Sequence, residues 1–214
     1  LSTQLVHGTN EGLLVEQLQF VSSIISGSSC RYSVTQVAAR RAGFSEWQDG
    51  SLMTRSRHHM ARLLTRDDCA MPPESGRALH ESDTLPLAEL MLAAYRGTID
   101  DEGESLDDAI GVVESLFEGV FGVLDTGASV VFAENGNLVA ATIVTHHDDH
   151  PLVAFSMTHP TATRRGLARR GLRHAIGQLA RSGCRDLRLV VTSGNLAAEA
   201  LYASEGFAVA PVPS

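Results

Sequence analysis

One stretch of the sequence combines residues that could hold an anion. Five of the 17 basic residues, all arginines, fall between positions 164 and 173, around Gly166 and Ala168. The apolar run "LVAFSMTH" precedes Pro160, and a helical pattern begins at Gly166. Because a helix start exposes unpaired N–H groups and the positive end of the dipole, it can bind phosphate. The stretch therefore predicts a phosphate site, although a turn glycine and exposed arginines also occur without a ligand.

A second segment, "VVTSGNLAAEALYASEGF", follows this one downstream. Its ordered anchor residues are Asn195, Ala198, Leu201, Tyr202, Gly206 and Phe207. With both segments in this order, the chain resembles the GNAT superfamily of acyl-CoA-dependent N-acyltransferases. The resemblance covers residues 77–211 and is strongest over residues 154–209.

The phosphate loop of that family usually reads Pro, two variable positions, Arg or Gln, two more variable positions, Gly, one variable position, and Gly or Ala. The corresponding residues here are Pro160, Thr163, Gly166 and Ala168. Thr163 departs from the pattern, and the two arginines that follow it could compensate for the missing side chain.

The resemblance implies roles for individual residues toward acetyl-CoA as cosubstrate. The CoA pyrophosphate would be held by the backbone amides of Arg164, Arg165, Gly166, Leu167 and Ala168. The strand end at Met157 and Thr158 would pair with the pantetheine arm and orient the thioester carbonyl. Asn195 would hydrogen-bond the pantetheine, and Tyr202 would protonate the departing thiolate. The 3′-phosphate could meet Arg169, Arg170 or Arg173.

Direct acetyl transfer to a primary amine is the reaction that this resemblance implies. A fixed backbone donor would stabilise the oxyanion, and transfer would depend on holding amine and thioester in line. A non-catalytic module that binds or senses acyl-CoA is the alternative. Tyr202 argues against that alternative, because a pure binder needs no acid. Apart from any ligand, Tyr202 could fill the groove between sheet and helix, and Asn195 could cap a helix, a role that can coexist with ligand binding.

Carboxylates in "GTIDDEGESLDD" could attract a cationic amine or act as its base, since the loop between the first two GNAT helices borders the acceptor site. Asp107 and Asp108 suit the first turn of a helix instead. The remaining candidates are Asp100, Asp101, Glu102 and Glu104, of which we favour Glu102 and Glu104.

Other residues could line the acceptor site or bind a ligand. Tyr95 ends a helix just before the acidic loop, and His159 could relay a proton from the amine. The "HHDDH" stretch, residues 146–150, is dense in possible metal ligands. Adjacent residues of a strand point to opposite faces, so we expect a polar hairpin tip and no metal site.

The elements that must position these residues follow from the hydrophobic pattern of residues 76–214. It predicts an α/β fold, a mixed sheet with helices on its faces. The resemblance implies that this sheet is GNAT-like and mostly antiparallel, with helices on both faces. The pair Asn135-Gly136 predicts a hairpin turn. Asp83 or Thr84 is expected to cap a helix, and Ser105 is expected to form a capping box with Asp108. The expected elements are a strand (77–82), helices (83–97 and 105–117), three strands (128–159), a helix (166–183), a strand (186–191), a helix (195–206) and a strand (207–212).

The first 75 residues read differently and are expected to be an N-terminal extension. Residues 11–27 and 33–44 have helical patterns, and residues 50–64 could include a strand. Pro72-Pro73 indicates a boundary, so we divide the chain at residues 75 and 76. The extension could be an interaction or dimerisation appendage, or a degenerate GNAT-like piece, because "VAARRAGF" faintly echoes the second segment.

Composition excludes several classes of function. The chain has 214 residues and a net charge of -8, and it contains no lysine, so Schiff-base and Walker-loop chemistry are excluded. The acidic balance argues against nucleic acid as a partner, and no apolar run is long enough to span a membrane. Three scattered cysteines suit the reducing cytoplasm. A homodimer is one open alternative, and the identity of the amine acceptor is also open.

Overall fold

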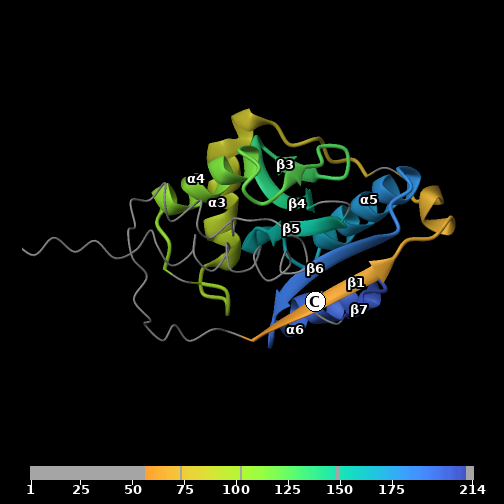
Figure 1. The fold of residues 1–214 in the computed structure, drawn as a ribbon. Coiled ribbons are helices and arrows are strands. Elements are labelled where there is room, and N and C mark those ends of the chain that lie inside the picture. The colour runs from red at the N-terminus through yellow and green to blue at the C-terminus, as the bar shows by residue number, and fades with distance from the viewer. Residues whose placement is uncertain (1–55, 73, 102, 148–149, 211–214) are drawn as a thin grey trace, which may run out of the picture.

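A single mixed sheet organises the protein (Figure 1). The computed structural model describes residues 56–72, 74–101, 103–147 and 150–210. The strand order is β2-β4-β5-β6-β1-β7, with β3 beside β4. The strands are β1 (Arg57–Leu63), β2 (Val123–Leu124), β3 (Val130–Glu134), β4 (Asn137–His147), β5 (His150–Thr158), β6 (Asp186–Thr192) and β7 (Ala208–Val209). The helices are α3 (Thr84–Tyr95), α4 (Leu106–Phe117), α5 (Leu167–Arg181) and α6 (Leu196–Ser204), with short 3-10 helices η1 (Asp67–Ala70), η2 (Glu81–Asp83) and η3 (Pro160–Ala162).

The two larger of three apolar cores in the described part of the chain lie on opposite faces of the sheet. Helices α3 and α4 pack on one face, against Phe155 and Met157 of β5. Helices α5 and α6 pack on the other face, against Val153 of β5 and Leu189 of β6. Since side chains alternate between the faces of a strand, residues of one strand supply both cores. This confirms the predicted α/β architecture with helices on both faces.

Most of the predicted elements after residue 83 are confirmed. Asn135 and Gly136 both have positive φ in the tight β3–β4 turn, as the two-residue hairpin requires. The capping box is also present, because the Ser105 side chain accepts from the Asp108 N–H and the Asp108 carboxylate accepts from the Ser105 N–H. The predicted helices at 11–27 and 33–44 lie outside the described residues.

The strand predicted at residues 77–82 is wrong. Arg77 forms one isolated bridge with Val131, and residues 81–83 form η2. The Asp83 carboxylate causes this turn, since it accepts from the His80 N–H at 3.0 Å and pairs with both terminal nitrogens of Arg77. Asp83 therefore occupies the N-cap position of α3, one of the two that the sequence offered, but its carboxylate closes the preceding turn and makes no hydrogen bond to α3.

Strand β1 belongs to the main sheet, although it precedes the expected boundary at residues 75 and 76. It pairs antiparallel with β6 over its whole length, from Arg57 opposite Thr192 to Leu63 opposite Asp186. The strand expected within residues 50–64 is therefore confirmed. Its place between β6 and β7 makes residues 57–63 part of the same layer as the rest of the sheet.

The chain segment that follows β1 is held against α5 by hydrogen bonds and an ion pair. The Arg181 guanidinium donates to the carbonyl oxygens of Cys69 and Met71, each at 2.9 Å. Near the other end of the helix, Arg170 pairs with Glu74 at 2.7 Å. Arginines of α5 thus hold the chain segment that leads from β1 to α3.

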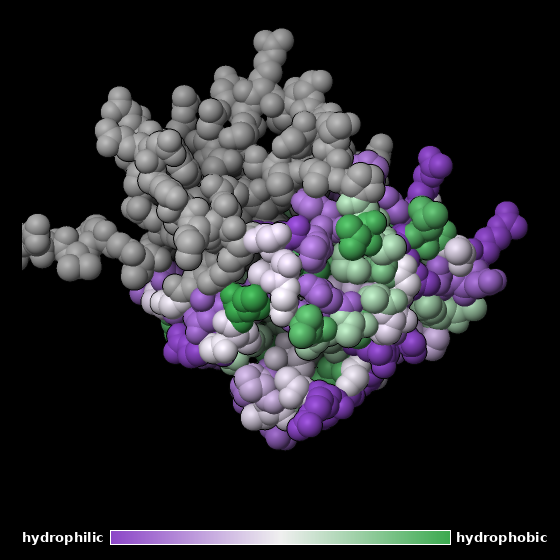
Figure 2. Space-filling model, turned by 90° about the horizontal axis from the view of Figure 1, so that it is seen from below, coloured by the Kyte–Doolittle hydropathy of each residue, from purple (hydrophilic) through white to green (hydrophobic). Residues whose placement is uncertain are grey.

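The face over β1, β7 and α6, seen from below in Figure 2, mixes apolar and polar residues. These elements and their ends expose the large apolar side chains of Leu63, Leu196 and Val209. Apolar side chains exposed singly are normal on a protein surface. Among the helices of the described ranges, none is long and apolar enough to cross a membrane.

Candidate active site

An opening in the sheet between β5 and β6 is the centre of the candidate site. These parallel strands pair only at Leu152 with Arg188 and at Val153 with Leu189. Beyond Val153 they run apart, toward the left of Figure 1. A bulge in β5 begins there, since Val153 and Phe155 lie opposite consecutive residues of β4 and Ala154 is left without a partner. Such bulges re-aim a strand and recur beside active sites.

The bulge also sets which backbone groups face the opening. The His159 N–H donates to the Val139 carbonyl of β4 at 2.8 Å. Because alternate residues of a strand direct their N–H groups to opposite sides, the Met157 N–H faces β4, and those of Ser156 and Thr158 face the opening. The Met157 side chain lies in the core, 1% exposed. The Ser156 N–H, which the sequence analysis did not consider, thus faces the opening together with that of Thr158, whereas the Met157 N–H does not.

The turn from β5 into α5 has a backbone suited to an anion. Gly166 precedes the helix with φ of 76°, and Arg164 has φ of 60°. A Cβ atom placed on Gly166 would meet nothing within 4 Å, so open space adjoins this backbone. Successive amides in such a turn, at the start of a helix, form a concave donor surface for an anion.

Thr163, the departure from the family pattern, has a structural role in this turn. Its hydroxyl donates to the Pro160 carbonyl at 3.0 Å and so closes η3. The side chain of Leu167 is buried, which leaves only its backbone available to a ligand. The loop therefore offers an anion mainly main-chain groups.

Four of the five clustered arginines are engaged with carboxylates of the protein. Glu205, whose side chain is only 4% exposed, receives two of them. The pairs are Arg165 with Glu134, Arg170 with Glu74, and both Arg169 and Arg173 with Glu205. Within the described residues, Arg164 alone of the five forms no ion pair. Most of the cluster thus holds α5 against its neighbours, and among the described residues only Arg164 of the five has no carboxylate partner.

Helix α6 brings Asn195 and Tyr202 to the same side of the sheet. Asn195 caps the helix, since its Oδ1 accepts from the Ala198 N–H at 3.2 Å. Tyr202 is 8% exposed and packs edge-on against Phe207. Burial raises the pKa of the Tyr202 phenol, a hydrogen bond with the Ser156 side chain opposes this rise, and the charge of Asp100 adds to it. The phenol is therefore protonated at neutral pH.

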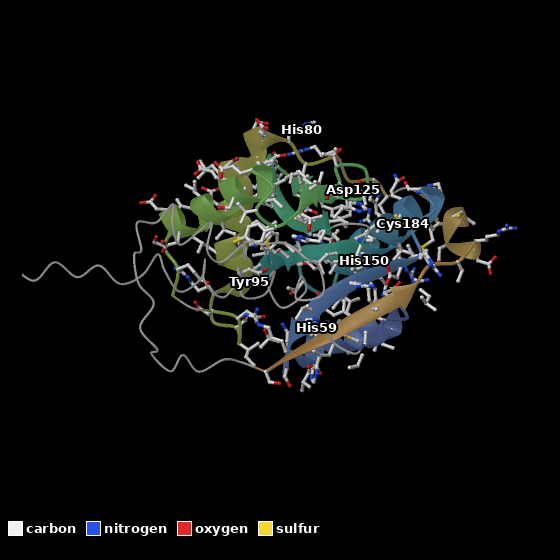
Figure 3. The ribbon with its side chains drawn as sticks, in the orientation of Figure 1. His59, His80, Tyr95, Asp125, His150 and Cys184 are labelled. Atoms are coloured by element: carbon white, nitrogen blue, oxygen red, sulfur yellow. The ribbon has the colours of Figure 1, made fainter. Side chains whose placement is uncertain are left out.

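The loop after α3 places acidic groups beside this phenol. The Asp100 carboxylate accepts from the Asn195 Nδ2 at 3.1 Å. Tyr95, labelled in Figure 3 near the end of α3, has its phenol pKa raised by burial and then by Asp100, Tyr202 and Glu104. The charge of Asp100 thus acts on both tyrosines, whereas that of Glu104 acts on Tyr95.

The other residues predicted to line the acceptor site differ in their surroundings. The Nδ1 atom of His159 accepts from the Thr161 N–H at 3.2 Å, so the ring caps η3. Glu104 is buried beside Tyr95, whereas Glu102 lies outside the described residues. In the described part of "HHDDH", His146 pairs with Asp125. No group of three or more His, Cys, Asp or Glu side chains among the described residues could hold a metal ion.

Comparison with known families decides the identity of this fold. A model of the acetyltransferase (GNAT) family matches residues 89–207, which is more than half of the chain. The chain belongs to the GNAT acetyltransferase family. The match includes the β5–α5 turn and helix α6, and it leaves β1 outside. No curated protein matches the sequence significantly.

Solved GNAT structures show the same fold at low sequence identity. A GCN5-related N-acetyltransferase from Sphaerobacter thermophilus is 18% identical, with a TM-score of 0.55, over 84% of this chain and 55% of that one. A ribosomal-protein-S18-alanine N-acetyltransferase from Escherichia coli is 24% identical, with a TM-score of 0.51, over 64% and 79%. The PaiA N-acetyltransferase from Thermoplasma acidophilum, solved with coenzyme A, is 18% identical, with a TM-score of 0.51, over 63% and 89%. This GNAT chain thus spans little more than half of the Sphaerobacter chain.

Proposed function

We propose that this GNAT protein transfers an acetyl group directly from acetyl-CoA to a primary amine. The observation that carries the proposal is the opening between β5 and β6. The N–H groups of Ser156 and Thr158 face this opening, and the Tyr202 phenol lies at the same end of β5, hydrogen-bonded to the Ser156 side chain. An extended ligand can pair with such an unpaired strand edge as an added strand does.

The residues of the site fit the parts of acetyl-CoA. The amides of residues 164–168 and the guanidinium of Arg164 would hold the pyrophosphate, with open space beside Gly166 to receive it. The outward groups of Ser156 and Thr158 would pair with the pantetheine. Asn195 has one Nδ2 proton and one Oδ1 lone pair beyond its two bonds within the protein, and these would hold the same arm.

Acetyl-CoA supplies an acetyl carbonyl activated as a thioester. The Ser156 N–H would stabilise the negative charge that develops on that oxygen as the amine nitrogen attacks. The C–N bond forms as the C–S bond breaks, and the phenol of Tyr202 gives its proton to the sulfur. The proton that the amine loses returns to the phenol through solvent. Tyr95, His159, Glu102 and Glu104 stay our candidates for lining the acceptor side.

The chemical role is tested by following thiol release from acetyl-CoA with a panel of primary amines. Tyr202→Phe should lower kcat about 100-fold, the lower end of the usual gain from general acid–base catalysis, and change KM little. If CoA binds but no amine raises release above hydrolysis, and Tyr202→Phe leaves that background unchanged, the chain is a CoA-binding module and the proposal is wrong.

The binding role is tested by two matched glycines at opposite ends of α5. Gly166 and Gly183 both have positive φ and no atom within 4 Å of an added Cβ, so alanine should cost similar backbone strain at both positions. Gly166→Ala should raise the Kd of CoA about tenfold or more, because the methyl group occupies the proposed phosphate space, and Gly183→Ala should not. Equal effects would refute the assignment of the phosphate site.

A further inference from the structure

Asp100 presents a fixed carboxylate without a cationic partner. The Oδ2 atom of Asp100 accepts a hydrogen bond from the Asn195 Nδ2 at 3.1 Å, and the backbone N–H of Asp100 donates to the Thr98 hydroxyl at 3.1 Å. Within the described ranges, no arginine or histidine forms an ion pair with this half-buried side chain. Carboxylates removed from water are normally compensated by a cation. The negative charge of Asp100 is therefore available to a bound molecule.

The position of Asp100 places that charge at the reacting centre. It acts on the phenols of both Tyr95 and Tyr202. Helix α3, which carries Tyr95, and helix α6, which carries Tyr202, cover opposite faces of the sheet. The two phenols therefore approach each other where the sheet is open, and Asp100 lies beside both.

An unused hydroxyl at the same strand end also indicates a ligand. The Oγ1 atom of Thr158 is inaccessible to solvent and has no hydrogen-bond partner among the described residues. Thr158 is two residues after Ser156, so both side chains lie on the face of β5 that Tyr202 occupies. A buried hydroxyl without a partner destabilises the folded state, and a polar ligand group would relieve that cost.

We propose that the acceptor of this site carries a second cationic group beside its reacting amine, and that Asp100 binds this group. The proposal rests on the amine transfer proposed above. The reacting nitrogen must be neutral when it attacks, so it cannot remain the partner of the carboxylate. A neighbouring ammonium keeps its charge throughout and forms a charge-assisted hydrogen bond with Asp100. The acceptor class is thus a diamine or polyamine, or a larger molecule with two amino groups at that spacing.

Calorimetric titration of the CoA-saturated full chain tests this binding without turnover. The probes are 1,4-diaminobutane and 1-aminobutane, which differ by one amino group. We expect the diamine to bind at least tenfold more tightly. Asp100→Asn, which keeps an oxygen for Asn195 but lacks the charge, should reduce this preference to less than threefold. Asp100→Glu should retain part of it.

Asp107→Asn is the matched control. It removes an exposed carboxylate from the same acidic stretch, at the first turn of α4. This variant should keep the preference for the diamine, which separates a local contact from the overall charge of the loop. Equal affinities of the two amines in the unmodified chain, no binding of the diamine, or an undiminished preference in Asp100→Asn would each overturn the proposal.

The two proposals fail in different ways. Binding of the diamine that depends on Asp100, without thiol release from acetyl-CoA, would uphold the cation site and refute acetyl transfer. Equal kcat/KM and equal affinity for the two amines would uphold acetyl transfer and refute the cation site.

Discussion

Replacement of Gly171 should reveal how closely α5 packs on the sheet. A Cβ atom at this position would lie 2.1 Å from the Thr142 Oγ1 of β4 and 2.9 Å from its Cβ. Neither atom lies at the end of a flexible side chain, so helix and strand must separate. Such overpacking costs about 1–3 kcal/mol, and alanine regains about 0.5–1 kcal/mol over glycine inside a helix. We therefore expect Gly171→Ala to lower the free energy of unfolding by about 1–2 kcal/mol.

Urea unfolding of the full chain measures this change, and Gly111→Ala is its control. Gly111 lies in α4, where an added Cβ would meet nothing within 4 Å, so that variant should be more stable by about 0.5–1 kcal/mol. The opposite signs at two helical glycines would isolate the clash from helix propensity. For a chain of this size, the loss in Gly171→Ala corresponds to a melting temperature lower by about 2–8 °C.

A second substitution identifies the atoms in conflict. The Thr142 hydroxyl is buried and has no hydrogen-bond partner among the described residues, so Thr142→Ala alone should cost little. Combined with Gly171→Ala, it should restore at least half of the lost stability, since the pair is in direct contact. If Gly171→Ala instead matches Gly111→Ala in stability, the close packing of α5 on β4 is refuted.

The helix that Gly171 positions also carries the phosphate loop. Gly166 is five residues before Gly171, and the backbone between them is helical from Leu167. A displacement of α5 at Gly171 therefore reaches the loop amides. Gly171→Ala should also raise the KM of acetyl-CoA, an effect that Gly111→Ala should not produce.

Two further predictions concern charge. Glu205→Gln should lower the free energy of unfolding by about 1–2 kcal/mol in urea, because two half-exposed arginines, Arg169 and Arg173, lose their buried carboxylate partner. The exposed Glu134→Gln should give no measurable change, and equal losses would contradict the role of burial. The raised pKa of Tyr202 predicts that thiol release stays undiminished from neutral pH to the ordinary tyrosine pKa of 10.0 and falls only above it, as the phenol loses its proton. A fall in the rate below that pH that is absent from Tyr202→Phe would exclude the phenol as a fully protonated acid.

Local patterns predicted the elements well because their causes are local. The Asn135-Gly136 turn, the capping box that begins α4 and the amphipathic pattern of α5 each depend on residues close in sequence. Asp83 also acts locally, but its carboxylate bonds backward to His80 and Arg77. Sequence alone could not indicate the direction of that bond, which is why we expected a helix cap there.

The arginine cluster was harder to interpret because its partners are distant in sequence. Glu74 precedes Arg170 by 96 positions, and Glu205 follows Arg173 by 32. From the sequence these arginines could equally face a phosphate. The sequence also did not indicate that the N–H of Ser156, and not that of Met157, faces the opening. An extra residue in a strand reverses which groups face each side. No residue type around Ala154 predicts the bulge from the sequence.

The position of β1 has a consequence for the order in which the protein can fold. Among the described strands, β1 leaves the ribosome first, yet both of its partners, β6 and β7, are the last two to be made. Contacts of such large sequence separation form late, because a long loop must close before they contribute. A nascent chain that has completed β5 but not β6 must hold β1 with a bare backbone edge. The earliest of the described strands is therefore among the last to find its place in the sheet.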